Sequence, residues 1–307
     1  MKVTALAGGV GGAKLLVGLK RALDDDGELT AVVNTGDDST IYGLHVSPDV
    51  DIVTYWLAGR ADYERGWGIA GDSSEVVDAL ARLGAEAWFR LGDRDMATCI
   101  YRTERLKDGA TLSAVTDDIR RRLGIAARVI PMSDDPVRTI IDCADGRVLE
   151  FQEWFVRERC EPSVAEVRFA GMADAKPAPG VIDALEAADV IVICPSNPIV
   201  SIGPILSLPG VRAALRAHPR VVAVSPLVNG APLKGPADKL MGAVGEDVSA
   251  AGVAAMYGDF CDAFVVDATE TADERSITSP GMRGVKLDTL MTTHDVSERL
   301  ARELLSL

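Results

Sequence analysis

The chain has 307 residues, of which 48% are hydrophobic and 25% charged, a composition typical of globular proteins. Its formal net charge of −14 at pH 7 repels polyanions, which argues against nucleic acid or an acidic membrane surface as a partner. A small phosphorylated ligand stays compatible with this charge, because a few local cations and amide dipoles outweigh a screened global field.

The five cysteines lie far apart and form no CxxC pair, which predicts reduced thiols in a reducing compartment. No stretch reaches the ~18 apolar residues that a membrane span needs, and the N-terminus lacks the apolar segment of a signal peptide. We therefore expect a cytoplasmic protein.

Short apolar runs followed by turn residues recur along the chain. They continue without polar alternation, as strands buried on both faces do. The runs are VTALA (3–7), LTAVV (29–33), DVIVIC (189–194), RVVAVS (220–225) and AFVVDA (263–268). Helical periodicity lies between them, as in AKLLVGLKRAL (13–23). This alternation predicts an α/β fold with a Rossmann-like, doubly wound and mainly parallel sheet.

Two segments depart from this alternation of strands and helices. Residues 50–123 are rich in helical periodicity, whereas apolar and polar residues alternate over 127–170. Within the second segment Asp145-Gly146 separates two strand-like runs, which predicts an antiparallel hairpin insertion. Since no linker separates these parts, we expect residues 1–307 to form a single nucleotide-binding α/β unit.

A glycine cluster, AGGVGGAKL, follows the first expected strand and opens a helical pattern. Glycines let the backbone approach a ligand closely, and the free N–H groups of a helix start attract anions. Gly8, Gly9, Gly11 and Gly12 are therefore predicted to bind phosphate. Lys14 either faces the phosphates or projects into solvent. A tight turn without a ligand is the alternative.

The spacing of this cluster fits neither of the two commonest phosphate loops. The dinucleotide fingerprint begun at Gly9 requires glycine where Lys14 stands, and begun at Gly8 it fails at Val10. A P-loop begun at Gly8 requires glycine before Lys14 and a hydroxyl residue after it, but alanine and leucine occupy those positions.

Carboxylates follow the second expected strand, where ligands of doubly wound sheets bind. NTGDD contains Asn34 and Asp37, and SPDVD contains Asp49 and Asp51. Asn34 stands where a nicotinamide enzyme needs an acid, and Asp49 is interpreted as a helix cap or turn former. Because phosphates and carboxylates repel unless a hard cation lies between them, Asp37 and Asp51 are predicted to hold Mg²⁺ or to deprotonate a hydroxyl.

Later loops carry amide, hydroxyl and cationic groups that suit recognition of a base or ribose. The loop PSNPIVSIGPIL offers Ser196, Asn197 and Ser201, and the loop SPLVNGAPLKGPADKLM offers Lys234 and Lys239.

Two further groups of residues are ambiguous. Asp93 and Asp95 in LGDRD have the pattern of a helix cap or of a solvated face. Tyr55, Trp56 and Trp67 are candidates for stacking on a ring, although aromatic residues at helical spacing more often form core.

Together these motifs resemble one known family. GGVGGAKLL, VVNTGDD, SPDVDIVTYWLAG, GWGI, LGDRDMAT, PMSDDPVRT, EFQEWFVR, PSNPIVSIGPIL, SPLVNGAPLKGPADKLM and DTLMTT occur in this order up to about residue 293. They resemble the 2-phospho-L-lactate transferases of deazaflavin coenzyme F-420 biosynthesis. LGDRD and SNPxxSIGPIL are the specific motifs, whereas the glycine loop alone is not.

The resemblance implies an Mg²⁺-dependent transferase, and it favours a homodimer. Such an enzyme moves a phospholactyl or phosphoenolpyruvyl group from a guanosine diphosphate ester, lactyl-2-diphospho-5'-guanosine or enolpyruvoyl-2-diphospho-5'-guanosine. The acceptor is the terminal ribityl hydroxyl of the deazaflavin Fo (7,8-didemethyl-8-hydroxy-5-deazariboflavin), and GMP leaves. No motif indicates which three-carbon acid is carried.

Site roles are also implied by the resemblance. Asp51 and Arg90 match positions that contact the deazaflavin, and relatives often have lysine at the Arg90 position. Asp37 matches an acidic position near the reacting phosphate, so Asp37 and Asp51 are the expected catalytic residues. The glycine loop and the PSNP loop match nucleotide-binding segments. The alternative function is a non-catalytic regulator of a related family that binds nucleotide sugars.

Overall fold

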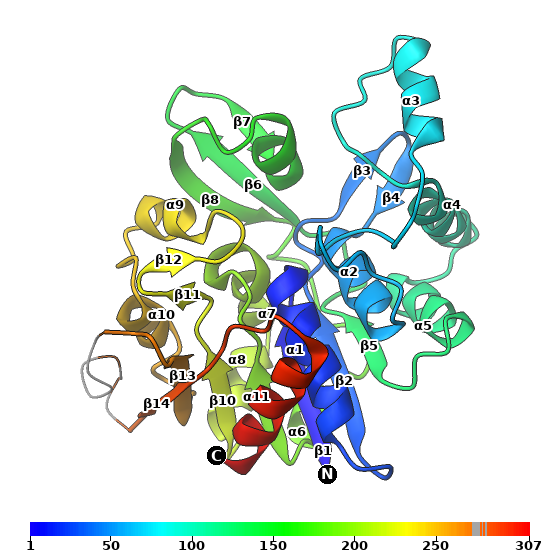
Figure 1. Ribbon diagram of the computed structural model, residues 1–307. Helices are drawn as coiled ribbons and strands as arrows, with labels where there is room; N and C mark the ends of the chain where they lie inside the picture. Colours follow the sequence, from blue (N-terminus) through cyan, green and yellow to red (C-terminus); the bar gives the residue numbers. More distant parts are fainter. Residues whose placement is uncertain (272–276, 278, 280) are drawn as a thin grey trace.

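The computed structural model describes residues 1–271, 277, 279 and 281–307 (Figure 1). Its centre is a seven-stranded sheet with the order β14-β13-β10-β9-β1-β2-β5, in which every pair of neighbours is parallel. The strands are β1 (Lys2–Ala7), β2 (Glu28–Val33), β5 (Arg128–Pro131), β9 (Val190–Ile193), β10 (Val221–Val224), β13 (Ala263–Asp267) and β14 (Arg283–Leu287). The predicted α/β fold with a parallel sheet is confirmed.

Helices cover both faces of this sheet (Figure 1). One face packs against α1 (Gly9–Ala22), α2 (Pro48–Leu57) and α11 (His294–Ser306). The other packs against α6 (Val181–Glu186), α7 (Gly203–Ser207), α8 (Val211–Ala217), α9 (Ala237–Ala243) and α10 (Ala250–Met256). Successive side chains of a strand point to opposite faces. Accordingly, Ala5 and Ala7 of β1 belong to the first core and Leu6 to the second.

The helix-rich segment lies beside the sheet and has a small core of its own. It contains α3 (Glu75–Arg82), α4 (Asp93–Lys107) and α5 (Leu112–Arg122), preceded by the hairpin of β3 (Ser39–Ile41) and β4 (Leu44–Val46). Val77, Leu91 and Cys99 are buried in this core. The α2 helix connects the segment to the sheet, since its residues pack in the sheet core.

The antiparallel insertion is a three-stranded sheet with the order β7-β6-β8. Its strands are β6 (Arg138–Cys143), β7 (Val148–Glu150) and β8 (Val164–Ala170), and Asp145-Gly146 turns between the first two. The insertion is shorter than the predicted range 127–170. Residues 128–131 form β5, which pairs with β2 in the parallel sheet. A π-helical turn, η1 (Glu153–Arg157), follows β7.

The strand order places a crevice at the carboxyl ends of β1 and β9. The chain passes from β1 to β2 on one side and returns later to β9 on the other side of β1. Loops after such neighbouring strands separate, and ligands of open α/β sheets bind between them.

Within the described part of the chain, no single helix has the length and apolarity to cross a membrane. The helical segments 198–207 and 211–217 have that length and apolarity only when taken together, and the chain bends by 89° between them.

Candidate functional site

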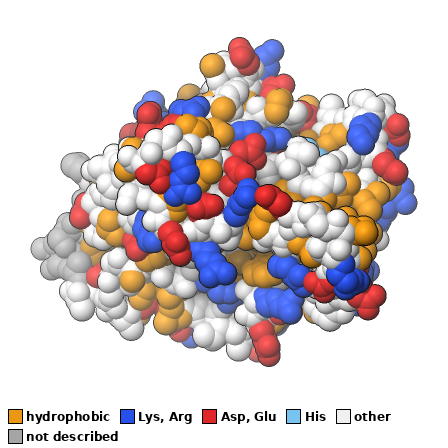
Figure 2. Space-filling model, turned by 90° about the horizontal axis from the view of Figure 1, so that it is seen from above, with side chains coloured by type: hydrophobic (Ala, Val, Ile, Leu, Met, Phe, Trp, Pro, Cys, Tyr) orange, Lys and Arg blue, Asp and Glu red, His pale blue; other side chains and the backbone are white. Residues whose placement is uncertain are grey.

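A cavity of about 600 Å³ occupies this crevice. Figure 2 looks down on this end of the molecule, where hydrophobic side chains lie among Lys and Arg side chains. The lining residues come from segments far apart in the sequence: 8–11, 37, 46–55, 65–68, 89–95, 151–156, 195–201 and 234–236. The cavity therefore brings together the glycine loop, the predicted carboxylates and the PSNP loop.

The glycine loop needs glycine because its backbone is packed against other loops. A Cβ atom on Gly8 would lie 2.4 Å from Oδ2 of Asp49, and one on Gly11 would lie 2.4 Å from the Pro195 carbonyl oxygen. Gly9 has a φ of +61°, which disfavours any side chain. These three glycines line the cavity at the start of α1. Gly12 instead packs under the loop, against Ser196.

Lys14 lies away from the cavity wall. Its Nζ donates a hydrogen bond of 3.0 Å to the carbonyl oxygen of Met291 and lies 5.8 Å from the ring centroid of Trp56. Burial, followed by the charge of Lys234, lowers the pKa of Lys14. Lys14 thus connects α1 to the segment before α11. The sequence predicts that it either faces the phosphates or projects into solvent, and this contact is a third arrangement.

The PSNP loop shapes the part of the cavity next to the glycine loop through its side chains. The Ser196 hydroxyl accepts a hydrogen bond from the Gly8 N–H (3.1 Å) and donates one to the Gly8 carbonyl (2.7 Å). Asn197 Oδ1 caps the π-helical turn η2 (Pro198–Ile202) by accepting from the backbone. Ser201 is buried and lines the cavity beside Gly8. Ser196 and Asn197 therefore hold the backbone in place.

Asp49 is part of the site, although its sequence context indicated a helix cap or turn. Its Oδ1 accepts a hydrogen bond from the Gly9 N–H (2.8 Å), and its Oδ2 accepts one from Asn34 Nδ2 (2.9 Å). Burial raises the pKa of Asp49 to about 6, and the charge of Asp38 adds to this. A carboxylate at a helix start is also stabilised by the helix dipole. Asp49 therefore joins α2 to the glycine loop.

Asp37 lies in the cavity wall with an unmatched carboxylate oxygen. The residue is 5% exposed, and among the described residues its Oδ1 has no hydrogen-bond partner. Burial and the nearby charge of Asp49 raise the pKa of Asp37 well above its usual value. Three oxygens of its sequence neighbours are also buried without a hydrogen-bond partner within the described chain: Thr35 Oγ1, Asp38 Oδ1 and Ser39 Oγ. A carboxylate oxygen in a cavity wall is a ligand that a hard cation prefers.

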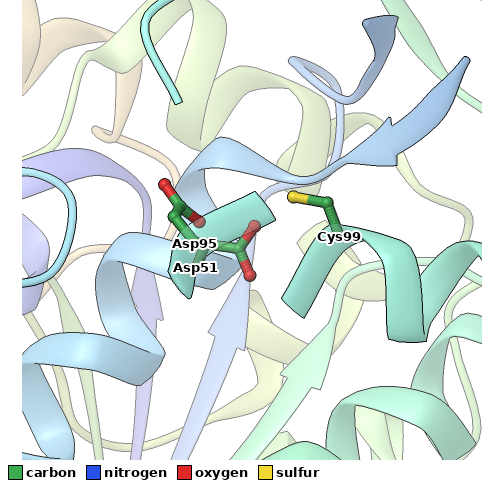
Figure 3. Close-up of side chains that lie close together, drawn as sticks. All are labelled: Asp51, Asp95 and Cys99. Carbon is green, nitrogen blue, oxygen red and sulfur yellow. The ribbon is translucent and has the colours of Figure 1, made fainter. Parts of the chain in front are cut away.

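Asp51 lies in the same wall and forms a buried ion pair with Arg102 of α4. The two Nη atoms of Arg102 donate to the two carboxylate oxygens, with 3.1 Å between Nη1 and Oδ2. Figure 3 shows Asp51 facing Asp95 and Cys99 of α4. One ligand atom from each of these three residues lies within 4.8 Å of the others. Because both oxygens of Asp51 bind Arg102 and a thiol is a poor Mg²⁺ ligand, Mg²⁺ fits Asp37 better than this trio.

The two acidic residues of LGDRD have different roles. Asp93 caps α3, because its carboxylate accepts hydrogen bonds from the N–H groups of Glu75 (3.1 Å) and Val76 (3.0 Å). Asp95 faces the cavity, and its Oδ1 accepts from the Tyr55 hydroxyl at 2.8 Å. Burial and the charge of Asp51 raise the pKa of Asp95 to about 7.

Replacing Asp95 with asparagine should therefore stabilise the protein at high pH. An unfolded Asp has a pKa of ~3.9, so ionisation of Asp95 favours the unfolded state as the pH rises from about 4 to about 7. We expect the stability gain of Asp95→Asn to be larger at pH 8 than at pH 5 by about 2 kcal/mol. Urea unfolding of the wild type and the variant at both pH values measures this difference in the free energy of unfolding. An equal gain at the two pH values would contradict the raised pKa.

Aromatic side chains form a further part of the cavity wall. The rings of Phe151 and Phe155 are stacked, with centroids 5.4 Å apart and an interplanar angle of 11°, and both line the cavity. Trp67 also lines it and is half-exposed, and the buried Tyr55 side chain lines it as well. Trp56 instead forms core and donates from Nε1 to the Gly66 carbonyl. Phe151 and Phe155 stand in the EFQEWFVR motif of the segment with alternating polarity, and no sequence signal marked them as site residues.

Cations lie around the mouth of the cavity. Arg90 lines it with a half-exposed side chain that binds Asp78 (2.6 Å) and Ser74 (2.5 Å). Lys234 also lines it, and its Nζ donates to the carbonyl oxygen of Arg65, another lining residue. Lys239 lies elsewhere and donates to the Cys160 carbonyl.

Comparisons with known proteins identify a family for this chain. The family described as 2-phospho-L-lactate transferase CofD matches residues 3–302. A 2-phospho-L-lactate transferase of Methanosarcina mazei is 45% identical over 295 residues, which cover 96% of each chain. A phosphoenolpyruvate transferase of Streptomyces griseus is 42% identical over 313 residues, covering 100% of this chain and 98% of the relative.

A solved structure supports the fold. The crystal structure of a Bacillus halodurans protein has a TM-score of 0.63 and 17% sequence identity, and the alignment covers 99% of both chains. With the same architecture and these full-length sequence matches, the chain belongs to the 2-phospho-L-lactate transferase CofD family.

Proposed function

We propose that this protein transfers a phospholactyl or phosphoenolpyruvyl group from a guanosine diphosphate ester to the terminal ribityl hydroxyl of the deazaflavin Fo, and that GMP leaves. The observation that carries the proposal is one cavity whose lining contains the glycine loop, buried carboxylates and aromatic side chains. The names of the relatives support the transferred group.

The phosphate end of the cavity suits a nucleoside diphosphate. Gly11 lies in the first turn of α1, where backbone N–H groups and the helix dipole favour anions, whereas the Gly9 N–H already donates to Asp49. The hydrogen bonds from Ser196 fix this loop before a ligand binds. Arg65 and Lys234 at the mouth add positive charge. The guanosine diphosphate ester therefore binds here, with its terminal phosphate toward the carboxylates.

The aromatic part of the lining suits a flat, largely apolar ring system. Phe151 and Phe155 offer ring faces on which a deazaflavin can stack, and stacked aromatic pairs contribute about 0.5–1.5 kcal/mol beyond their buried area. Arg90 also lines the cavity, and its guanidinium carries donors for polar edges of the ring. The ribityl chain then extends toward Asp51, another lining residue.

Phosphoryl transfer requires charge neutralisation and in-line positioning rather than a covalent nucleophile. Asp51 orients the attacking hydroxyl, since Arg102 fixes its carboxylate. Asp37 is the residue that would hold Mg²⁺, because it lines the cavity and its Oδ1 has no hydrogen-bond partner within the described chain. When bound, Mg²⁺ neutralises phosphate charge and offsets the repulsion between phosphates and the acidic wall.

The function is tested by incubating the protein with Fo, Mg²⁺ and either guanosine ester. We expect GMP and a phosphorylated deazaflavin to form in equal amounts, as measured by chromatography. Comparing kcat/KM for the two esters determines which acid is transferred. Binding of guanosine nucleotide without release of GMP would favour the non-catalytic regulator instead. The predicted cytoplasmic location and homodimer are separate proposals, and light scattering tests the dimer.

Replacing Arg90 with alanine should raise the KM for Fo about tenfold or more, with a smaller effect on the KM for the guanosine ester. The reason is that Arg90 lines the cavity with a half-exposed guanidinium, and a hydrogen bond to a charged group is worth ~1.5–3 kcal/mol. Arg82→Ala, on the neighbouring helix α3 and outside the cavity lining, is the control. An unchanged KM for Fo would remove Arg90 from the deazaflavin pocket.

A further inference from the structure

Arg102 lies behind Asp51, on the side away from the cavity. Asp51 lines the cavity, whereas Arg102 is 1% exposed and is not one of the lining residues. The guanidinium holds both oxygens of the carboxylate. A two-point contact of this kind fixes the plane of the carboxylate as well as its position. Arg102 therefore determines which way Asp51 presents its oxygens to the cavity.

The ion pair is a costly way to fill this space. Within the described chain the Nε atom of Arg102 is buried without a hydrogen-bond partner, although Nη1 also donates to the His45 carbonyl at 3.3 Å. Removing two charges from water costs several kcal/mol, and apolar residues of similar volume are often at least as stable. Packing alone thus gives no reason for a guanidinium here, whereas orientation of a carboxylate in the cavity wall does.

We propose that Arg102 is a positioning residue for the transfer reaction: it holds the Asp51 carboxylate in the one orientation that meets the attacking hydroxyl. The inference rests on the proposed function of this cavity. Arg102 acts only through Asp51, since Asp51 lies between it and the cavity. Loss of the guanidinium therefore disturbs the reacting geometry without removing a contact to either substrate.

The test is a double-mutant cycle of Arg102→Met and Asp51→Asn, with kcat and both KM values as readouts. We expect Arg102→Met to lower kcat about 100-fold, the size of loss that misplacement by about 1 Å causes, with the KM for the guanosine ester within about twofold of wild type. In the Asp51→Asn background the same change should lower kcat less than about twofold, because residues that act through one another are not additive.

Arg102→Lys separates positioning from folding. Lysine keeps the charge but offers a point contact instead of a planar fork, so we expect a kcat between those of wild type and Arg102→Met. If Arg102→Met does not fold, because it leaves the Asp51 charge buried and unpaired, Arg102→Lys and the double variant complete the comparison. Arg105→Met, on an exposed part of the same helix, should leave kcat and KM unchanged.

Two results would overturn the proposal. One is an Arg102→Met effect on kcat of equal size in both backgrounds, and the other is an Arg102→Lys variant no more active than Arg102→Met. Either would make Arg102 a merely structural residue while the wild-type chain still transfers the group. A wild-type chain that binds Fo, seen by its fluorescence, but never releases GMP would instead overturn the proposed function and the role of Arg102 with it.

Discussion

Replacing Asp37 with asparagine is expected to lower kcat by about a thousandfold or more, while the affinity for guanosine nucleotide changes little. Asparagine has nearly the same shape but lacks the charge that a hard cation requires. Asp37 does not touch the backbone of the glycine loop, which is held by Asp49 and Ser196. Nucleotide binding therefore keeps its main contacts when Asp37 is changed.

The measurements are kcat for GMP release, the dissociation constant of GDP and the Mg²⁺ concentration that gives half-maximal rate. Because the variant removes a buried charge, its melting temperature should equal or exceed that of wild type. A lower activity therefore does not reflect unfolding. Asp142→Asn, at an exposed ion pair on β6, is the matched control. A near-wild-type kcat for Asp37→Asn would show that Asp37 neither holds the cation nor takes part in transfer.

Replacing Gly11 with alanine is expected to reduce the affinity for guanosine nucleotide more than tenfold. The added Cβ would lie 2.4 Å from the Pro195 carbonyl oxygen. Because the backbone fixes the position of the Cβ and the oxygen is itself a backbone atom, α1 and the loop after β9 must move apart. Overpacking of this kind costs about 1–3 kcal/mol of stability. The displaced N–H groups of α1 would no longer converge on the phosphates.

Gly242→Ala in α9 is the matched control for this substitution. Its added Cβ would have Val248 Cγ2 as its nearest neighbour, at 3.9 Å, so only helix propensity changes. Alanine should then stabilise the protein by up to about 1 kcal/mol. Calorimetric titration with GDP and urea unfolding measure both variants. If Gly11→Ala binds GDP as tightly as wild type, the close packing of the glycine loop is not required for binding.

The parallel sheet was predictable because its central strands are runs of buried β-branched residues, which are recognisable locally. The strand β5 was not, since Arg128–Pro131 is short and stands next to a segment of alternating polarity. Its place beside β2 is decided by pairing across about a hundred residues of chain, which periodicity does not report. The Asp145-Gly146 turn was predictable because the hairpin forms between neighbouring residues.

The site was predictable only where a motif is local. Asp49 has the sequence context of a helix cap, yet its partner is the Gly9 N–H, 40 residues away. Nothing in the local sequence RTERL indicates that Arg102 is buried, because its ion-pair partner Asp51 lies 51 residues away. Phe155 lines the cavity from the π-helical turn that follows β7 and packs against Phe151 there. Such long-range contacts depend on the whole fold, so sequence spacing cannot contain them.

The hydrogen bonds between Ser196 and Gly8 have a consequence for how the protein is made. They join residues 188 positions apart, so the glycine loop cannot take its final shape until the second half of the chain has been synthesised. In a P-loop, by contrast, the loop supplies its own phosphate cradle within a few residues. Long-range closure of this kind slows folding. A growing chain that ends before β9 therefore lacks the packed glycine loop, so under the proposed function GTP or GDP in the cell cannot assist its early folding.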